Sequence, residues 1–253
     1  MPPVFGALII GDEILSGKRQ DKHLAKVIEV LGARQLELGW ARYLGDEPMR
    51  ITATLKETLA SADIVFSFGG IGATPDDYTR QCAAAALGVP LHQHPDAVAE
   101  MKAKAGFELT ANRLRMAEFP VGSTIVPNSY NRIAAFSVRD HHFLPGFPEM
   151  AWPMMEWVLD TRYPHLFNQV QAAEEIIVIK EAGESHLIDM MDRIVANYPG
   201  IKLSSLPQFV GNGRIIEFSL RGDPDSVPRA MAEMKSHVRD LGFEFEVKPA
   251  VKT

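Results

Sequence analysis

Residues 66–79, with the sequence FSFGGIGATPDDYT, combine two chemical features that oppose each other. A glycine-rich turn follows an apolar run, and such turns can hold phosphate through backbone N–H groups. Its glycines are Gly69, Gly70 and Gly72. Asp76 and Asp77 come directly afterwards, and their carboxylates would repel a phosphate. Because Mg²⁺ is often held by one or two carboxylates together with substrate phosphates, a divalent cation on Asp76 and Asp77 would remove the conflict.

A second interpretation of the same residues needs no ligand. Thr74 can cap a helix over residues 75–88, Pro75 suits the first helical position, and Asp77 stands where a capping-box acid would reach back. Acidic residues are common in a first helical turn because they complement the helix dipole. The local sequence leaves both interpretations open.

Alternating strands and helices place these residues in the first part of the chain. Apolar runs at 4–10 and 63–68 predict buried strands, and 34–45 predicts another. Helical patterns cover 21–32, 47–62 and 75–88, with Gly32 and Gly88 as expected carboxyl-terminal caps. This order predicts an α/β fold with a parallel sheet covered on both faces.

Ligands of such sheets bind at the carboxyl ends of the strands. The glycine turn follows one predicted strand at that edge, and Asp12 and Glu13 follow another. Asp46 offers a further carboxylate in the sequence LGDEP. These acids are therefore expected near the glycine turn.

The pattern changes near residues 166–173. Upstream, 95–117 predicts two short helices, 133–146 a hairpin turning at Arg139-Asp140, and 147–163 an apolar helix kinked at Pro153. Downstream, the order β-α-β-β-α-β predicts a small α+β domain of the split βαβ type. We therefore expect two domains, 1–168 and 172–250.

The length, net charge and cysteine count restrict the class of protein. The chain has 253 residues and a net charge of -6, which argues against a general nucleic-acid binder. The single cysteine, Cys82, excludes a disulfide within the chain and fits a reducing compartment. The amino terminus is too short for a membrane span and lacks a basic leader, so we expect a cytoplasmic protein with no membrane partner.

Four motifs in order resemble a known family. GDEILSG, GDEP, GGIGATPDDYTR and LPGFPEM are together similar to the molybdopterin-binding domain family, most closely the amino-terminal part of the competence/damage-inducible protein A family. The sequence AGESHLIDMM is similar to that family's KH-like segment. The resemblance implies a three-layer α/β/α domain, a KH-like α+β domain and a homodimer or homotrimer. We expect no counterpart of the deamidase domain that many relatives carry.

The resemblance also implies an activity and a set of site residues. Relatives either transfer adenylate from Mg-ATP to molybdopterin or hydrolyse ADP-ribose with a divalent metal, so a nucleotide or pterin ligand and Mg²⁺ are implied. By the resemblance, Asp77 is the principal acid and Asp46 a second one, with Asp76 beside them. The implied phosphate- and ligand-binding positions are Gly69, Gly70, Gly72, Thr74, Thr79, Asp12, Glu13, Pro145, Gly146 and Glu149.

Two segments depart from the family pattern. His23 replaces an asparagine, and residues 128–136 (NSYNRIAAF) replace a segment rich in glycine and proline. Tyr130, Asn131 and Arg132 are expected in that wall, where Arg132 would either bind phosphate or fill space. Three hypotheses remain open: a metal-dependent ADP-ribose hydrolase, a molybdopterin-binding or adenylyl-transfer protein, and a non-catalytic scaffold with an altered pocket.

Other residues invite weaker interpretations. His92, His94, His141 and His142 lack the spacing of a zinc site, so we expect them in surface loops. Trp152 and Trp157 are expected in the core or at a subunit interface. A KH-like domain suggests RNA, but the Gly211–Gly213 hairpin is not a GxxG loop, so we expect no nucleic-acid partner.

Overall fold

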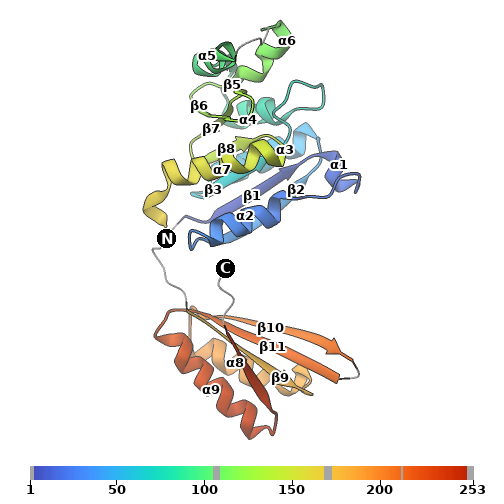
Figure 1. Cartoon of the computed structure of the whole chain (residues 1–253), viewed down its shortest axis with the longest axis vertical. Helices are drawn as coiled ribbons and strands as arrows, with labels where there is room; N and C mark the ends of the chain where they lie inside the picture. Colours follow the sequence, from blue (N-terminus) through green and yellow to red (C-terminus); the bar gives the residue numbers. More distant parts are fainter. Residues whose placement is uncertain (1–2, 105–108, 168–172, 212, 250–253) are drawn as a thin grey trace. The chain divides into compact units, whose positions relative to one another are not determined.

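The computed structural model describes residues 3–104, 109–167, 173–211 and 213–249. The chain divides into two compact units, Met1–Phe167 and Asn168–Thr253, whose elements are labelled in Figure 1. The predicted domain boundary, between 168 and 172, lies outside the described residues. Each unit is considered by itself.

Unit 1 contains a mixed six-stranded sheet with the order β2-β1-β3-β8-β7-β6. The first four strands of that order are parallel, and the last two are antiparallel to their neighbours. The strands are β1 (Phe5–Ile10), β2 (Leu38–Leu44), β3 (Ile64–Phe68), β6 (Thr124–Val126), β7 (Ala135–Val138) and β8 (His141–Leu144). β1 and β3 are buried along their whole length because helices cover both faces.

The two faces of the sheet have separate apolar cores. Helices α2 (His23–Gly32) and α7 (Pro148–Arg162) pack on one face through Val27, Leu31 and Met155. Helices α3 (Pro48–Leu59) and α4 (Thr79–Leu87) pack on the other through Leu55 and Cys82. The shorter elements are α1 (Asp12–Leu15), β4 (Leu91–Gln93), α5 (Pro95–Ala103), α6 (Ala111–Leu114), η1 (Arg115–Ala117), β5 (Glu118–Pro120) and η2 (Pro164–Leu166). The predicted three-layer α/β/α architecture is confirmed.

The strand order fixes where a ligand site can form. The chain leaves β1 on one side to reach β2 and then crosses to β3 on the other side. The connections after β1 and β3 therefore diverge, and such a switch point opens a crevice at the carboxyl ends of the strands. The segments that follow β1, β2, β3 and β8 all meet at this edge.

Two predicted helix boundaries were wrong. α4 begins at Thr79 rather than near Pro75, so Thr74 caps no helix. Residues 74–78 form a separate turn, because the loop must first return to the end of β3. Gly32 is the last residue of α2 rather than its cap, which is Ala33, and the chain reverses at Gln35 with φ 57°. Gly88 does cap α4 in the left-handed conformation, as predicted.

The prediction of histidines in surface loops was also wrong. His141 and His142 lie in β8 and are 2% and 0% exposed, and His94 is buried at the start of α5. The hydroxyl of Tyr163 donates to Asp140 (2.8 Å), so its oxygen accepts from Nε2 of His142 (2.7 Å). Nδ1 of His142 then accepts from the hydroxyl of Ser137 (2.7 Å). This buried hydrogen-bond chain joins β7, β8 and the end of α7.

Unit 2 has the predicted split βαβ order. Its antiparallel sheet is arranged β10-β11-β9-β12, and α8 and α9 bury their apolar side chains against one face. The elements are β9 (Ala173–Lys180), η3 (Glu184–His186), α8 (Ile188–Asn197), β10 (Lys202–Val210), β11 (Gly213–Gly222), α9 (Ser226–Asp240) and β12 (Phe245–Lys248). Among the described residues, no helix combines the length and apolar character that a membrane crossing would need.

Removing one hydroxyl from the buried chain should destabilise unit 1. In Tyr163→Phe, His142 and Asp140 both lose a partner, so we expect the free energy of unfolding in urea to fall by about 1–3 kcal/mol. Tyr130→Phe is the matched control because Tyr130 is 69% exposed. Equal unfolding midpoints for the two variants would contradict a structural role for the chain.

Acidification should weaken the fold through the two strand histidines. Burial lowers the pKa of His141 to about 4 and that of His142 well below 6.5. The unfolded chain binds protons near pH 6.5 while the folded chain does not, so stability is full above pH 6.5 and is lost as the pH falls toward 4. Urea unfolding between pH 7.5 and 4.5 should show a loss of about 1 kcal/mol per pH unit for each histidine. His141→Gln should make the free energy of unfolding depend less on pH. An unchanged pH dependence would contradict a contribution from His141.

Candidate functional site

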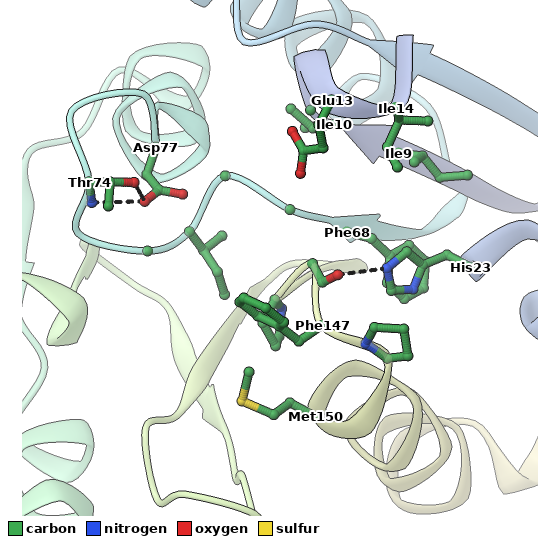
Figure 2. A pocket seen from close by; sticks show the side chains of 18 of the residues that line it. Ile9, Ile10, Glu13, Ile14, His23, Phe68, Thr74, Asp77, Phe147 and Met150 are labelled. Carbon is green, nitrogen blue, oxygen red and sulfur yellow. Dashed lines mark hydrogen bonds between the residues drawn. The ribbon is translucent and has the colours of Figure 1, made fainter. Parts of the chain in front are cut away.

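A cavity of about 680 Å³ lies at the carboxyl edge of the parallel strands. Its walls come from the segments after β1, β2, β3 and β8 and from residues between 128 and 134. Figure 2 shows Thr74 and Asp77 toward one end of this cavity and His23 with Phe68 toward the other, with Glu13 between them. The edge of the sheet at which the sequence predicts a ligand site therefore contains a cavity.

The glycine loop folds back on itself after β3. The hydroxyl of Thr79 donates to the carbonyl oxygen of Gly69 (3.0 Å), and the amide of Thr79 donates to that of Gly70 (3.0 Å). A Cβ on Gly69 would overlap the carbonyl of Ile10, and a Cβ on Gly70 would overlap the Thr79 hydroxyl. The glycines are thus required by the loop's own packing, in addition to any approach by a ligand.

Four successive amides of this loop are available to a ligand. The N–H groups of Gly70, Ile71, Gly72 and Ala73 donate to no other residue that the structure describes. Both the amide and the hydroxyl of Thr74 donate to Oδ2 of Asp77, the amide at 2.8 Å, as the dashed lines in Figure 2 show. This bond closes the turn at 74–77 and commits the Asp77 carboxylate to the loop itself.

Arg80 is a functional candidate that sequence reasoning missed. It is 1% exposed, and its guanidinium donates to the carbonyl oxygens of Gly72 (2.5 Å), Arg115 and Glu118 (3.3 Å). Burial lowers its pKa, and the charges of Glu118 and Asp77 oppose that shift. Arg80 ties the Gly72 carbonyl to the protein and so stabilises the glycine loop.

The acids from the other strand ends form a group of their own. The amide of Asp12 donates to the Asp46 carboxylate (2.9 Å), and the amide of Asp46 donates to that of Asp12 (3.1 Å). Partial burial raises the pKa of Asp46, and neighbouring carboxylates raise it further. Those carboxylates are Asp12, Glu13 and Asp76. Asp76 thus belongs to this group, whereas Asp77 accepts both hydrogen bonds from Thr74.

This group suits a divalent cation that a ligand helps to hold. Carboxylate oxygens are the donors that Mg²⁺ prefers, and their mutual repulsion around Asp46 would be relieved by a cation. In the described parts of the chain, no three His, Cys, Asp or Glu side chains gather closely enough to bind a metal ion unaided. An ion here would take its remaining ligands from phosphate oxygens and water.

The turn after β8 and the start of α2 form the far end of the cavity. Pro145, Gly146, Phe147 and Glu149 all line it. His23 stacks on Phe68 with ring centroids 4.5 Å apart, and its Nε2 donates to the carbonyl oxygen of Gly146 (3.2 Å). Burial lowers the pKa of His23, so its ring is neutral and links α2 to the turn.

The altered segment at 128–136 forms a wall without contributing a charge. Asn128 holds its own turn by donating to the carbonyl of Ile133 (3.1 Å) and accepting from the amide of Tyr130 (3.0 Å). Arg132 is turned away from the cavity and pairs with Glu100 (3.0 Å). Both predicted roles of Arg132, as a phosphate ligand and as a plug, were wrong.

Most residues predicted from the sequence meet at this cavity. Those that line it are Glu13, Asp46, Gly69, Gly70, Gly72, Thr74, Asp76, Asp77, Pro145, Gly146 and Glu149. Asp12 and Thr79 are not among the lining residues, because they hold Asp46 and the glycine loop from behind. Arg19, Lys22 and Phe147 line the cavity but were not predicted. The basic run KRQDK, directly after GDEILSG, was the available signal for the first two.

Comparison with known proteins shows the family to which the residues around this cavity belong. Residues 6–165 match the family model described as "Probable molybdopterin binding domain". The chain belongs to the molybdopterin-binding domain family. The matched residues include the sheet and every segment that lines the cavity.

Relatives within this family are CinA-like proteins. One from Anaeromyxobacter sp. (strain K) is 33% identical over 190 residues, covering 71% of this chain and 45% of the relative. Another, from Desulfovibrio desulfuricans, is 34% identical over 153 residues, covering 58% and 36%. The chain thus spans less than half the length of these two relatives. The crystal structure of the protein CinA from Thermoplasma acidophilum is 26% identical, with a TM-score of 0.56 over 62% of this chain and 95% of that chain.

Two glycines with the same backbone conformation allow a matched test of the loop. Gly70 has φ 68° and no room for a Cβ, whereas Gly88 has φ 71° and open space around it. Substitution by alanine should cost about 1 kcal/mol of stability at both sites through backbone strain. Gly70→Ala should lose clearly more in urea unfolding, because Thr79 must also move. Equal losses would show that Thr79 does not constrain the loop.

Proposed function

We propose that unit 1 binds a metal-complexed phosphate ligand, either a nucleotide or a pterin phosphate, and hydrolyses pyrophosphates of the ADP-ribose class. The observation that carries the proposal is the meeting of free loop amides with the Asp46 acid group in one cavity. Backbone N–H groups supply donors to phosphate oxygens, and carboxylates supply ligands to a cation. A pyrophosphate needs both kinds of partner as charge develops on it.

The chain's own residues would divide the work. The amides of Gly70 to Ala73 bind and orient a phosphate. Arg80 and Thr79 hold the loop that carries these amides in place. Asp46 and Asp76 would hold the cation, with Asp12 fixing Asp46 through two hydrogen bonds. Bound Mg²⁺ would neutralise charge on the phosphate oxygens and lower the pKa of a bound water. Asp77 stabilises the loop that presents the amides.

A second candidate function is the binding of molybdopterin and its adenylylation. The family description favours it, and the apolar end of the cavity, which includes Ile14, Phe68 and Met150, can accept a planar ring. This candidate differs from the first in needing the pterin for ATP turnover. A third, a scaffold without a ligand, would apply if no such molecule bound.

A thermal-shift panel separates these functions. ADP-ribose, ATP and molybdopterin are each tested with and without Mg²⁺, and the products of stabilising ligands are identified. We expect metal-dependent stabilisation by ADP-ribose and release of AMP. ATP turnover only with the pterin would instead support adenylyl transfer. No shift with any of the three would overturn ligand binding and leave the scaffold.

Substitutions of single carboxylates test which acids hold the cation. Asp46→Asn and Asp76→Asn should weaken the Mg²⁺-dependent part of ligand binding about tenfold, measured by calorimetry, while the fold stays intact. Glu47→Gln is the matched control, because Glu47 follows Asp46 directly but pairs with Arg50 and does not line the cavity. Asp77→Ala should also lower the unfolding midpoint, since Thr74 loses its partner. If Asp77→Ala alone abolished metal dependence, the assignment of Asp76 would be wrong.

A further inference from the structure

The charged side chains that line the cavity come from different segments according to sign. The acids lie after β1, after β2, in the glycine loop and, as Glu149, in the first turn of α7. The cations that line the cavity, as far as the chain is described, are Arg19 and Lys22. Both belong to the connection between α1 and α2, residues 16–22.

Neither cation is neutralised by a close carboxylate. Arg19 lies 4.0 Å from Glu13, with both side chains about half exposed, and an ion pair of this kind contributes at most about 1 kcal/mol. Lys22 makes no ion pair with a described residue. Three other arginines of unit 1 hold carboxylates at 2.5–2.7 Å. These are Arg34, Arg42 and Arg50.

The connection is nevertheless held in place at both ends. The amide of Arg19 donates to the carbonyl oxygen of Glu13 (2.9 Å). Asp21 accepts from the amides of His23 (2.8 Å) and Leu24 (3.2 Å) and from the hydroxyl of Tyr43 (2.7 Å). The helix amides are therefore occupied by Asp21, which leaves Arg19 and Lys22 as the positive groups of this segment at the cavity.

Phe147 orients the arginine from the opposite side. The guanidinium of Arg19 lies 5.6 Å from the centre of the Phe147 ring, which is itself half exposed at the cavity. This cation–π contact fixes the guanidinium without consuming its hydrogen-bond donors. Those donors remain available to an anion.

We propose that Arg19 and Lys22 form a second anion subsite, which binds a second phosphate of the ligand while the glycine loop binds the first. The inference rests on the proposed function and specifies its substrate class: a nucleoside diphosphate or its esters, in preference to a monophosphate. Charge supports it, because a nucleoside diphosphate such as ADP keeps negative charge after it binds one divalent cation. Arg19 and Lys22 are the cations of the described cavity lining that can pair with it.

Calorimetric titration with AMP and ADP tests the subsite, because the two probes differ by one phosphate. In the presence of Mg²⁺, wild-type protein should bind ADP at least about tenfold more tightly than AMP. Arg19→Gln combined with Lys22→Gln should remove most of this difference and change AMP affinity by less than about twofold. Lys18→Gln is the matched control: it removes a positive charge from the same connection but from a residue that does not line the cavity.

Each outcome bears on the inference. If wild-type protein binds AMP and ADP equally, or the double variant keeps the preference for ADP, the second subsite is wrong while the proposed function stands. If Lys18→Gln reduces ADP affinity as much as the double variant, the effect is general charge rather than a subsite, which also overturns it. If wild-type protein binds neither probe and the thermal-shift panel is silent, the proposed function fails together with the subsite.

Discussion

The hydrogen bond from the Thr79 hydroxyl to the Gly69 carbonyl closes the loop on which the site is built. Residue 70 must lack a side chain, because a Cβ there would overlap the Thr79 hydroxyl, and α4 begins at Thr79, two residues after Asp77. With the loop closed, Arg80 points into the protein and holds the Gly72 carbonyl. The N–H groups of Gly70 to Ala73 have no acceptor among the described residues, so a phosphate can use them.

The charges around the cavity follow from the same topology. Four parallel strands end at one edge, and each contributes a different short segment to it. Acids that are far apart in the sequence, such as Asp12 and Asp46, meet there and exchange amide–carboxylate hydrogen bonds. That arrangement concentrates negative charge around Asp46, while the connection before α2 places Arg19 and Lys22 at the cavity.

The architecture could be predicted from the sequence because it depends on local patterns. Uninterrupted apolar runs marked β1 and β3, helical periodicity marked α2 and α3, and the change of pattern after residue 166 marked unit 2. Most of the site followed as well, because its residues directly follow the strands. What failed depended on distant contacts: the fully buried His142 needs Tyr163, 21 residues away, and Arg80 needs carbonyl groups at 115 and 118.

The direction of the side chain of Arg132 could not be predicted either. Its left-handed backbone conformation, with φ of 60°, and its partner Glu100 are properties of the folded chain. The same holds for Asp77, whose place in the sequence fits a cap or a metal ligand equally well. In the folded chain Thr74 donates to Oδ2 of Asp77, a contact that the order of the residues alone does not determine.

The buried chain through Ser137, His142, Tyr163 and Asp140 has a practical consequence for dissecting the protein. Tyr163 is the residue that follows α7, only a few residues before unit 1 ends at Phe167. A fragment that stopped with the last turn of α7 would retain every segment that lines the cavity and yet expose His142 to water. The shortest fragment suitable for studying ligand binding in unit 1 must therefore extend past Tyr163, although Met150 is the last of the described residues that line the cavity.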